Sequence, residues 1–328
     1  MESVVGSWPQ IQTGVGPESP SKSAAFQKES TDPMKNWQQY ILAHSVQEAL
    51  EALESAQGPV HPIGGGTDLL LEIQQGSHSP VHTLVDVTQI PELTRLEIIG
   101  DSLFIGAGVP VRQITDSQLV RHHALAVSEA CGLIGGPQVR NTATLGGNVA
   151  HALPAADGMI SLFAFDAQVE IASKEGQRRA SIASLFKGPG KSTLIPNREI
   201  LIGFYLPVRK SGQASAFSRV MRPQGVALPI LNLAICLQRT ENHIDDIRIA
   251  IGPSGPVPVR ATMVEQMLRG QDYSPQLLMN AKGAIHESIP FRTSAMRATA
   301  AYRHHLSEVL LDEVFETAWE RAVQLEVV

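Results

Sequence analysis

Short apolar runs bounded by turn residues recur along the first two thirds of the chain, and such runs predict strands. Gly100-Asp101 lies between two of these runs and predicts a tight hairpin turn. The expected strands cover residues 60–63, 81–87, 96–99, 103–107, 167–172 and 200–206.

Helical spacing of apolar residues appears between and after these runs. Ser45 and Glu48 have the Ser-x-x-Glu spacing of a capping box, and Leu50 and Leu53 follow, so we expect a helix over about 46–57. Further helices are expected at 114–120 and 124–131. Residues 141–158 show no clear periodicity and predict a long loop rich in Gly, Ala and Asn.

The last third has a different order of elements. Three apolar runs in succession predict an antiparallel meander, and three helical segments follow it. A domain boundary is expected near the charged stretch 209–214. The predicted strands are 216–220, 230–239 and 244–251, and the predicted helices are 259–269, 275–287 and 297–323.

Composition narrows the class of protein. The chain has 328 residues, of which 43% are hydrophobic and 18% charged, as in globular proteins. The net charge of −6 and the absence of a basic stripe argue against nucleic acid as a partner. No apolar run is long enough to span a membrane, and the N-terminus lacks the features of a signal peptide.

The two cysteines, Cys131 and Cys236, are too few for a four-thiolate metal site, so we expect no metal here and predict two buried apolar side chains. So few cysteines in a long chain favour a reducing compartment, and we expect a cytoplasmic protein. Residues 9–33 are rich in Pro, Ser, Gly and Gln, which predicts a disordered tail over residues 1–33.

The first group of candidate ligand residues is Ile63-Gly64-Gly65-Gly66-Thr67-Asp68-Leu69. Consecutive glycines let a ligand lie against bare backbone, and successive amides can surround phosphate oxygens. Thr67 or Asp68 could cap a helix that starts here. Taken alone, this stretch is better explained as an ordinary glycine-rich turn.

The second group lies in residues 140–158, where small residues again allow a ligand to approach the backbone. Thr144 and Asn148 offer neutral hydrogen bonds, and Asp157 could accept one from a ribose or ribityl hydroxyl. Loops this long in compact domains are usually functional or disordered, and this one is too apolar to be disordered. His151 is interpreted as a loop histidine that bonds backbone or a phosphate.

Taken together, the two groups resemble the FAD-binding subunit of the molybdenum hydroxylases, the xanthine dehydrogenase and carbon monoxide dehydrogenase family. The resemblance covers about residues 34–325, and GPGKSTL favours the xanthine dehydrogenase branch. The matching stretches are GGGTDLL, IGAGVP, GPQVRNTATLGGNVAHALPAADG, GPGK, REIL, AFSRV, RIAIGPSGPVPVRA and YRHHL.

The resemblance implies an α+β fold with a bipartite FAD-binding domain of the vanillyl-alcohol-oxidase (PCMH) type at 34–212. A C-terminal domain with a three-stranded antiparallel sheet and helices would follow at 213–328, similar to the carbon monoxide dehydrogenase flavoprotein C-terminal domain. It also implies that residues 63–69 surround the FAD pyrophosphate. Thr144, Gly147, Asn148 and Asp157 would lie on the pyrophosphate, ribityl or adenosine side, with Ile134 and Leu201 close to the flavin.

The function implied is electron transfer within a heterotrimer. FAD would accept electrons from an iron–sulfur subunit, which receives them from a molybdopterin-binding subunit, and would pass them to NAD or another acceptor. No residue of this chain is assigned an acid–base role. Several xanthine dehydrogenase-like members have Lys at the position of Ser218, beside the flavin.

Two alternatives remain open from the residues. A stand-alone FAD-dependent reductase or oxidase on the same fold would need its own acid and base, and no convincing pair is present in the sequence. A flavin-free scaffold subunit would have little reason to keep the small residues of both glycine segments together with Asp157.

Overall fold

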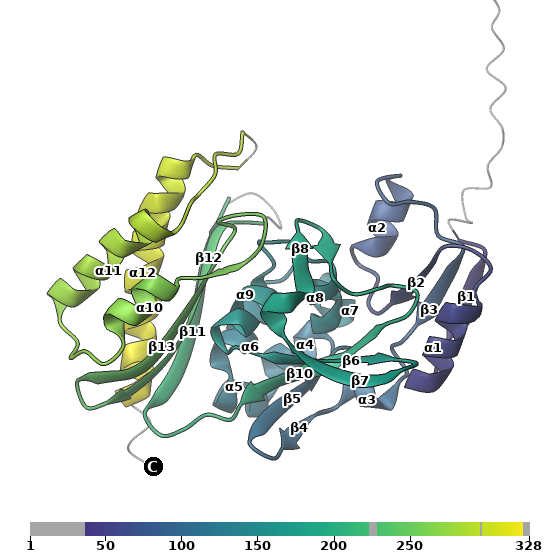
Figure 1. Ribbon diagram of the computed structural model, residues 1–328, viewed down its shortest axis with the longest axis horizontal. Helices are drawn as coiled ribbons and strands as arrows, with labels where there is room; N and C mark the ends of the chain where they lie inside the picture. The colour runs from purple at the N-terminus through teal and green to yellow at the C-terminus, as the bar shows by residue number, and fades with distance from the viewer. Residues whose placement is uncertain (1–36, 223–227, 296, 324–328) are drawn as a thin grey trace, which may run out of the picture. The chain divides into compact units, whose positions relative to one another are not determined.

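The computed structural model describes residues 37–222, 228–295 and 297–323, shown as a ribbon in Figure 1. The tail expected over residues 1–33 lies outside the described residues. All described residues belong to one compact unit. None of the helices in the described chain is both long and apolar enough to cross a lipid bilayer.

A small parallel sheet with strand order β1-β3-β2 begins the described chain. The strand predicted at 60–63 is confirmed as β2. The predicted capping box is also present, because the Ser45 side chain accepts a hydrogen bond from the Glu48 amide at 3.1 Å. The elements are β1 (Gln39–Leu42), α1 (Val46–Ser55), β2 (Val60–Ile63), α2 (Leu69–Gln74) and β3 (Thr83–Asp86).

A second sheet has five antiparallel strands in the order β4-β5-β10-β6-β7. The predicted hairpin at Gly100-Asp101 is confirmed, since Ile99 pairs with Ser102 across it. The elements are α3 (Pro91–Thr94), β4 (Leu96–Ile99), β5 (Ser102–Gly106), β6 (Gln168–Ser173), β7 (Gly176–Ser181), η1 (Ile182–Leu185), β8 (Phe186–Gly188), β9 (Lys191–Ser192) and β10 (Ile200–Pro207).

The two sheets share a hydrophobic core. Leu50 and Leu53 of α1 pack in one buried cluster with Val85 of the first sheet and with Phe104 and Ile202 of the second. Burial of these side chains gives the main favourable free energy for joining the sheets. The N-terminal part of the described chain is therefore bipartite, with one sheet in each half.

Six helices occupy the chain between β5 and β6, and here the prediction was partly wrong. The expected helix at 114–120 is two helices, because Ser117 is extended and its side chain caps the second by accepting from the Val120 amide at 3.3 Å. The six helices are α4 (Val111–Asp116), α5 (Gln118–His123), α6 (Leu125–Gly132), α7 (Pro137–Thr142), α8 (Leu145–Ala150) and α9 (Asp157–Ala164).

The segment 141–158, expected to be a loop, contains α8 and the start of α9. Glycine has a low intrinsic helix propensity, so the two glycines of α8 kept the sequence pattern from predicting a helix here. Tertiary contacts stabilise it instead: Leu145 and Val149 are fully buried, and the Gly146 amide donates to the Ala107 carbonyl at 2.9 Å.

The C-terminal part confirms the three long antiparallel strands, and a two-residue fourth strand extends their sheet in the order β11-β12-β13-β14. Three helices follow, as predicted. The elements are β11 (Gln213–Met221), β12 (Pro229–Thr240), β13 (His243–Gly252), β14 (Val259–Arg260), α10 (Thr262–Leu268), α11 (Pro275–Ser288) and α12 (Ala300–Val323).

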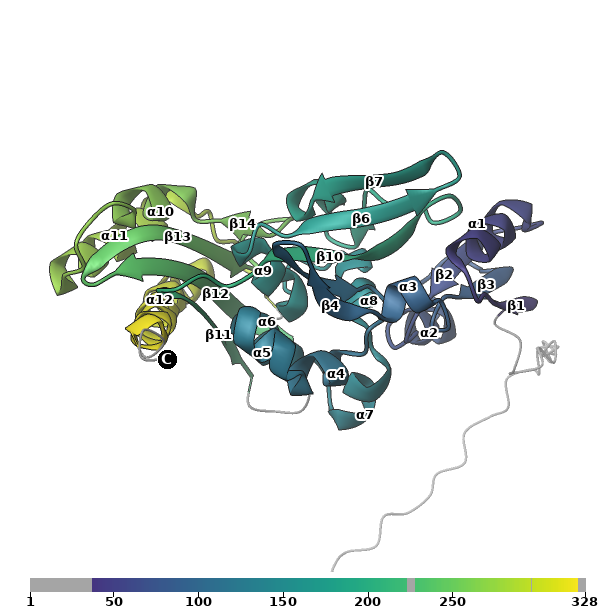
Figure 2. The ribbon, with the colours of Figure 1, turned by 90° about the horizontal axis from the view of Figure 1, so that it is seen from below.

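Both faces of this C-terminal sheet are buried. Leu233 and Ile235 of β12 pack in the core formed with α10, α11 and α12, whereas Ala234 and Cys236 belong to the core of the N-terminal part. Figures 1 and 2 both show α6 and α9 beside β11 and β12 on this second face. The small side chains of Ala234 and Cys236 leave room for these helices to approach.

Candidate functional site

The glycine loop, residues 64–68, connects the end of β2 to α2. In the described residues, none of the four amides of residues 64–67 donates a hydrogen bond. Gly66 has φ +65°, a conformation that glycine adopts at no steric cost. Asp68 is the N-cap of α2, but its side chain makes no capping bond. Free successive amides at a helix start are suited to bind the oxygens of an anion.

The α8 segment, residues 143–150, uses its backbone differently. The amides of residues 145–148 all donate: to the carbonyls of Val109 and Ala107, to the Thr144 side chain at 3.0 Å, and to the Thr144 carbonyl. Among the described residues, the buried side-chain oxygen Oδ1 of Asn148 has no partner. This segment therefore offers an unpartnered side-chain acceptor, whereas its amides form hydrogen bonds that stabilise the fold.

The glycine loop and the α8 segment lie against each other. A Cβ on Gly65 would lie 1.9 Å from the Thr142 carbonyl oxygen, and one on Gly64 would lie 3.1 Å from Thr144 Oγ1. Real Cβ atoms do not approach a carbonyl oxygen as closely as 1.9 Å, so any side chain at Gly65 would force the two segments apart. Glycine is required here because two stretches of backbone meet.

His151 ties the same two segments together from the C-terminal end of α8. Its Nε2 lies 2.9 Å from Glu72 Oε1 of α2, and its Nδ1 lies 3.6 Å from Asp68 Oδ2. The sequence predicted a bond to backbone or phosphate, and the structure places carboxylates beside the ring instead. Asp68 ends the glycine loop as the N-cap of α2, and Glu72 belongs to that helix.

Asp157, at the start of α9, faces the C-terminal sheet. Its Oδ2 pairs with Arg219 of β11, and its Oδ1 accepts from Asn232 Nδ2 of β12 at 2.8 Å. The Asp157 side chain is only 5% exposed and that of Arg219 only 8%. Burial raises the pKa of Asp157, and Arg219 and Asn232 oppose that shift.

Arg219 and Asn232 were not among the residues singled out in the sequence. Asn232 is fully buried, and its Nδ2 also donates to the Ala155 carbonyl at 3.2 Å. In the described part of the chain, Arg219 Nε and Asn232 Oδ1 lack partners. The signal that could have pointed to them is an asparagine and an arginine within apolar strands, where an uncompensated polar group is costly.

Leu201 belongs to the hydrophobic core of the N-terminal part, and Ile134 packs against that core. Among the described residues, neither forms a backbone hydrogen bond with the glycine loop. Ile134 is half-buried after α6, where Arg140 donates to the carbonyls of Ile134 and Gly135 at 3.3 and 2.6 Å. Leu201 is buried in β10, at an irregularity in its pairing with β6.

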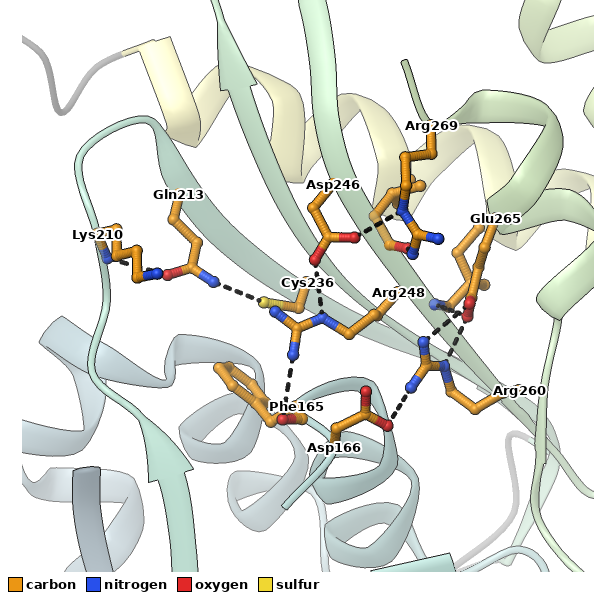
Figure 3. Close-up of polar contacts among 12 residues, drawn as sticks. Phe165, Asp166, Lys210, Gln213, Cys236, Asp246, Arg248, Arg260, Glu265 and Arg269 are labelled. Carbon is orange, nitrogen blue, oxygen red and sulfur yellow. Dashed lines mark hydrogen bonds and ion pairs between the residues drawn. The ribbon is translucent and has the colours of Figure 1, made fainter. Parts of the chain in front are cut away.

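A second set of polar contacts between the domains lies at the C-terminal end of α9 (Figure 3). Arg248 of β13 donates to the Phe165 carbonyl at 3.3 Å, and Arg260 of β14 pairs with Asp166. Arg260 also pairs with the buried Glu265 at 2.6 Å. Helix α9 is thus held to the sheet at both ends, by Asp157 at its start and by these arginines at its end.

Ser218 Oγ donates to Glu313 of α12 at 2.9 Å, so its side chain is directed away from the face that carries Phe217 and Arg219. Cys131 and Cys236 are buried free thiols, as predicted, and burial raises the pKa of both. Across the described residues, no group of three His, Cys, Asp or Glu side chains is placed to hold a metal ion.

In the described residues, a loop of free amides lies against a segment with a buried, unpartnered acceptor. Comparison with known proteins identifies the group it is suited to bind. The family described as FAD binding domain in molybdopterin dehydrogenase matches residues 33–209, and the family described as CO dehydrogenase flavoprotein C-terminal domain matches residues 215–318.

Individual relatives agree with this assignment. The chain is 30% identical to the nicotine 6-hydroxylase medium subunit of Paenarthrobacter nicotinovorans, over 86% of this chain and 97% of that protein. It is 28% identical to a xanthine dehydrogenase FAD-binding subunit of Escherichia coli O157:H7, over 78% and 87%. Carbon monoxide dehydrogenase of Hydrogenophaga pseudoflava superposes with a TM-score of 0.81 at 25% identity, covering 87% of this chain and 98% of that one.

The chain belongs to the FAD-binding medium subunits of the molybdenum hydroxylases, and its cofactor is FAD. The α+β fold with a bipartite FAD-binding domain and a flavoprotein C-terminal domain is confirmed. The residues present fit the cofactor, because the free amides of the glycine loop suit a pyrophosphate and Asn148 Oδ1 lacks a partner among the described residues.

Proposed function

We propose that this chain carries electrons inside a molybdenum hydroxylase complex most like xanthine dehydrogenase. An iron–sulfur subunit would deliver the electrons, a molybdopterin-binding subunit would oxidise the organic substrate, and NAD or another acceptor would receive the electrons. The GPGKSTL stretch and the similarity to a xanthine dehydrogenase FAD-binding subunit support this choice. Bound FAD supplies the chemistry, since flavins exchange electrons in ones and twos.

The observation that carries the proposal is the row of free amides at residues 64–67, held against the α8 segment. We assign residues 63–69 to the pyrophosphate of FAD. Thr144, Gly147 and Asn148 would lie on the pyrophosphate, ribityl or adenosine side, where Asn148 Oδ1 is available to accept a hydroxyl hydrogen.

Asp157 belongs to the same side of the cofactor in this proposal. Its two oxygens already accept from Arg219 and Asn232, and each carboxylate oxygen has a second lone pair with which to accept from a ribityl or ribose hydroxyl. Ile134 and Leu201 would contact the flavin ring with apolar surface. No side chain of the chain is assigned a proton-transfer role.

The domains proposed from the sequence, 34–212 and 213–328, then have separate tasks. The first holds FAD, and the second packs against α6 and α9 and fixes Asp157. We also propose a cytoplasmic location, which two buried thiols that remain unpaired favour.

The test is to purify the chain from its host with whatever binds it, and to record the absorbance spectrum, metal content and subunits. We expect a flavin spectrum, iron, molybdenum and two further chains. Reduction of the flavin by xanthine, followed by reoxidation with NAD, would support both the substrate class and the acceptor. Flavin without partner chains or metals, together with turnover by the chain alone, would contradict the proposal and favour a stand-alone flavoenzyme.

A further inference from the structure

A cavity of about 420 Å³ lies where the two domains join, and none of the residues proposed to bind FAD lines it. Its walls come from α5, from the linker between β10 and β11, and from strands β11 and β12. Gly212 in that linker has φ +68°, and a Cβ there would lie 2.2 Å from the Arg239 carbonyl oxygen. The path of the linker, and with it this wall, therefore depends on glycine.

The rim of the cavity is basic. Arg121 and Arg209 line it, and each uses its Nε for a backbone carbonyl, that of Thr115 at 2.9 Å and that of Gln213 at 2.8 Å. Within the described residues neither guanidinium forms an ion pair with a carboxylate, whereas the third arginine, Arg321, pairs with Glu129 at 2.6 Å. The terminal nitrogens of Arg121 and Arg209 are therefore donors without an anionic partner in this part of the chain.

His123 adds a neutral donor to the same rim. Its Nδ1 accepts from the Arg209 amide at 3.2 Å, so the neutral ring carries its hydrogen on Nε2. Burial lowers the pKa of His123, with His122 and Arg209 contributing, which favours that neutral form. Burial also lowers the pKa of Arg209.

The floor is apolar and held in place. Leu125, Phe165 and Cys236 line it; Leu125 is half-buried, and Phe165 and Cys236 are each 2% exposed. Both polar atoms of the Gln213 side chain form hydrogen bonds. Its Oε1 accepts from the Lys210 amide at 2.9 Å, and its Nε2 donates to Cys236 Sγ at 3.4 Å (Figure 3). The wall is therefore formed before any ligand arrives.

We propose that this cavity binds a small organic carboxylate, with the carboxylate on Arg121 and Arg209 and a flat apolar body over Leu125 and Phe165. Its volume falls in the range of ligand pockets, roughly 300–1,000 Å³, and a few polar groups around an apolar floor are typical of such sites. The proposal is independent of which subunit supplies electrons to FAD.

Benzoate is a suitable probe, with neutral benzamide and inorganic phosphate as matched ligands, measured by saturation-transfer NMR on the FAD-loaded protein. We expect benzoate to bind more tightly than either control. Arg209→Gln should weaken benzoate binding about tenfold or more, because a charge-assisted hydrogen bond contributes about 1.5–3 kcal/mol. Arg121→Gln should act in the same direction.

Arg198→Gln is the control variant, since Arg198 is exposed and does not line the cavity. It should bind benzoate as the unmodified protein does, and an unchanged flavin spectrum would show that each variant is folded. Equal binding of benzoate and benzamide, or equal loss in all three variants, would overturn the proposal. Binding of phosphate alone would overturn the assignment of an apolar ligand body.

Discussion

The glycine loop and the α8 segment contact each other, yet they use their backbones in opposite ways. The amides of residues 64–67 have no partner in the described chain, whereas those of residues 145–148 are all bonded. An unbonded amide in a folded protein is available to a ligand, and a bonded one stabilises the fold. The first segment is therefore suited to hold an anion, and the second to hold the first in place.

The two segments also differ in the property of the protein that we expect each to control, FAD binding or stability. The glycines of the glycine loop are half-buried and lie beside Thr142 and Thr144, whereas the α8 segment leads into Asp157, which is bound to the C-terminal sheet. Substitutions in the glycine loop should mainly change FAD binding. Substitutions at the Asp157 contact should mainly change stability.

The largest effect is expected from Arg219→Ala, which leaves the buried carboxylate of Asp157 with Asn232 as its remaining donor. Removing one partner of a buried ion pair costs about 3–5 kcal/mol of unfolding free energy, measured here by urea denaturation at pH 7. Arg198→Ala, at an exposed site, is the matched control and should change stability by roughly 0.5 kcal/mol or less.

The pH dependence of this variant has a definite sign. Burial already raises the pKa of Asp157, and loss of Arg219 removes a charge that lowers it. The folded variant then binds a proton that the unfolded chain releases, so its stability falls as pH rises from the unfolded value of about 3.9 through the raised pKa. The loss of unfolding free energy caused by Arg219→Ala should thus be smaller in mild acid than at pH 7. A deficit independent of pH would show that Asp157 is not the group responsible.

An intermediate effect on stability is expected from Gly65→Ala, whose Cβ would meet the Thr142 carbonyl. Overpacking of this kind costs roughly 1–3 kcal/mol, and displacement of the amides should lower FAD affinity by about tenfold or more. Flavin absorbance per polypeptide measures the second effect. Gly64→Ala should have a smaller effect, because its contact distance is 3.1 Å.

Gly188→Ala is the control for both glycine variants, because no atom lies within 4 Å of a Cβ at that position. Its flavin content should match that of the unmodified protein. If Gly65→Ala also kept full flavin content, the glycine loop would not be the pyrophosphate site.

The smallest effect is expected from Thr144→Ala, which removes the side chain that caps α8 at the Gly147 amide. Loss of an N-cap costs about 1 kcal/mol, measured as the change in unfolding free energy. Thr144→Ser keeps the hydroxyl and should restore most of the stability and the flavin content. Equal losses in both variants would assign the effect to packing of the methyl group and not to the cap.

The sequence alone predicted most elements whose signal is local. The capping box at Ser45, the hairpin at Gly100-Asp101 and the C-terminal meander each depend on neighbouring residues, and each is present. The glycine loop was found for the same reason, since three consecutive glycines after a short apolar run are visible without any fold.

Only the tertiary structure determined the rest. Helix α8 was missed because its glycines disfavour a helix locally, and contacts with Ala107 and Val109 outweigh that preference. The partners of Asp157 were missed because Arg219 and Asn232 lie 62 and 75 residues away in the chain. Residues distant in sequence meet only when the C-terminal sheet packs on α9, so no local pattern could show that this carboxylate joins the two domains.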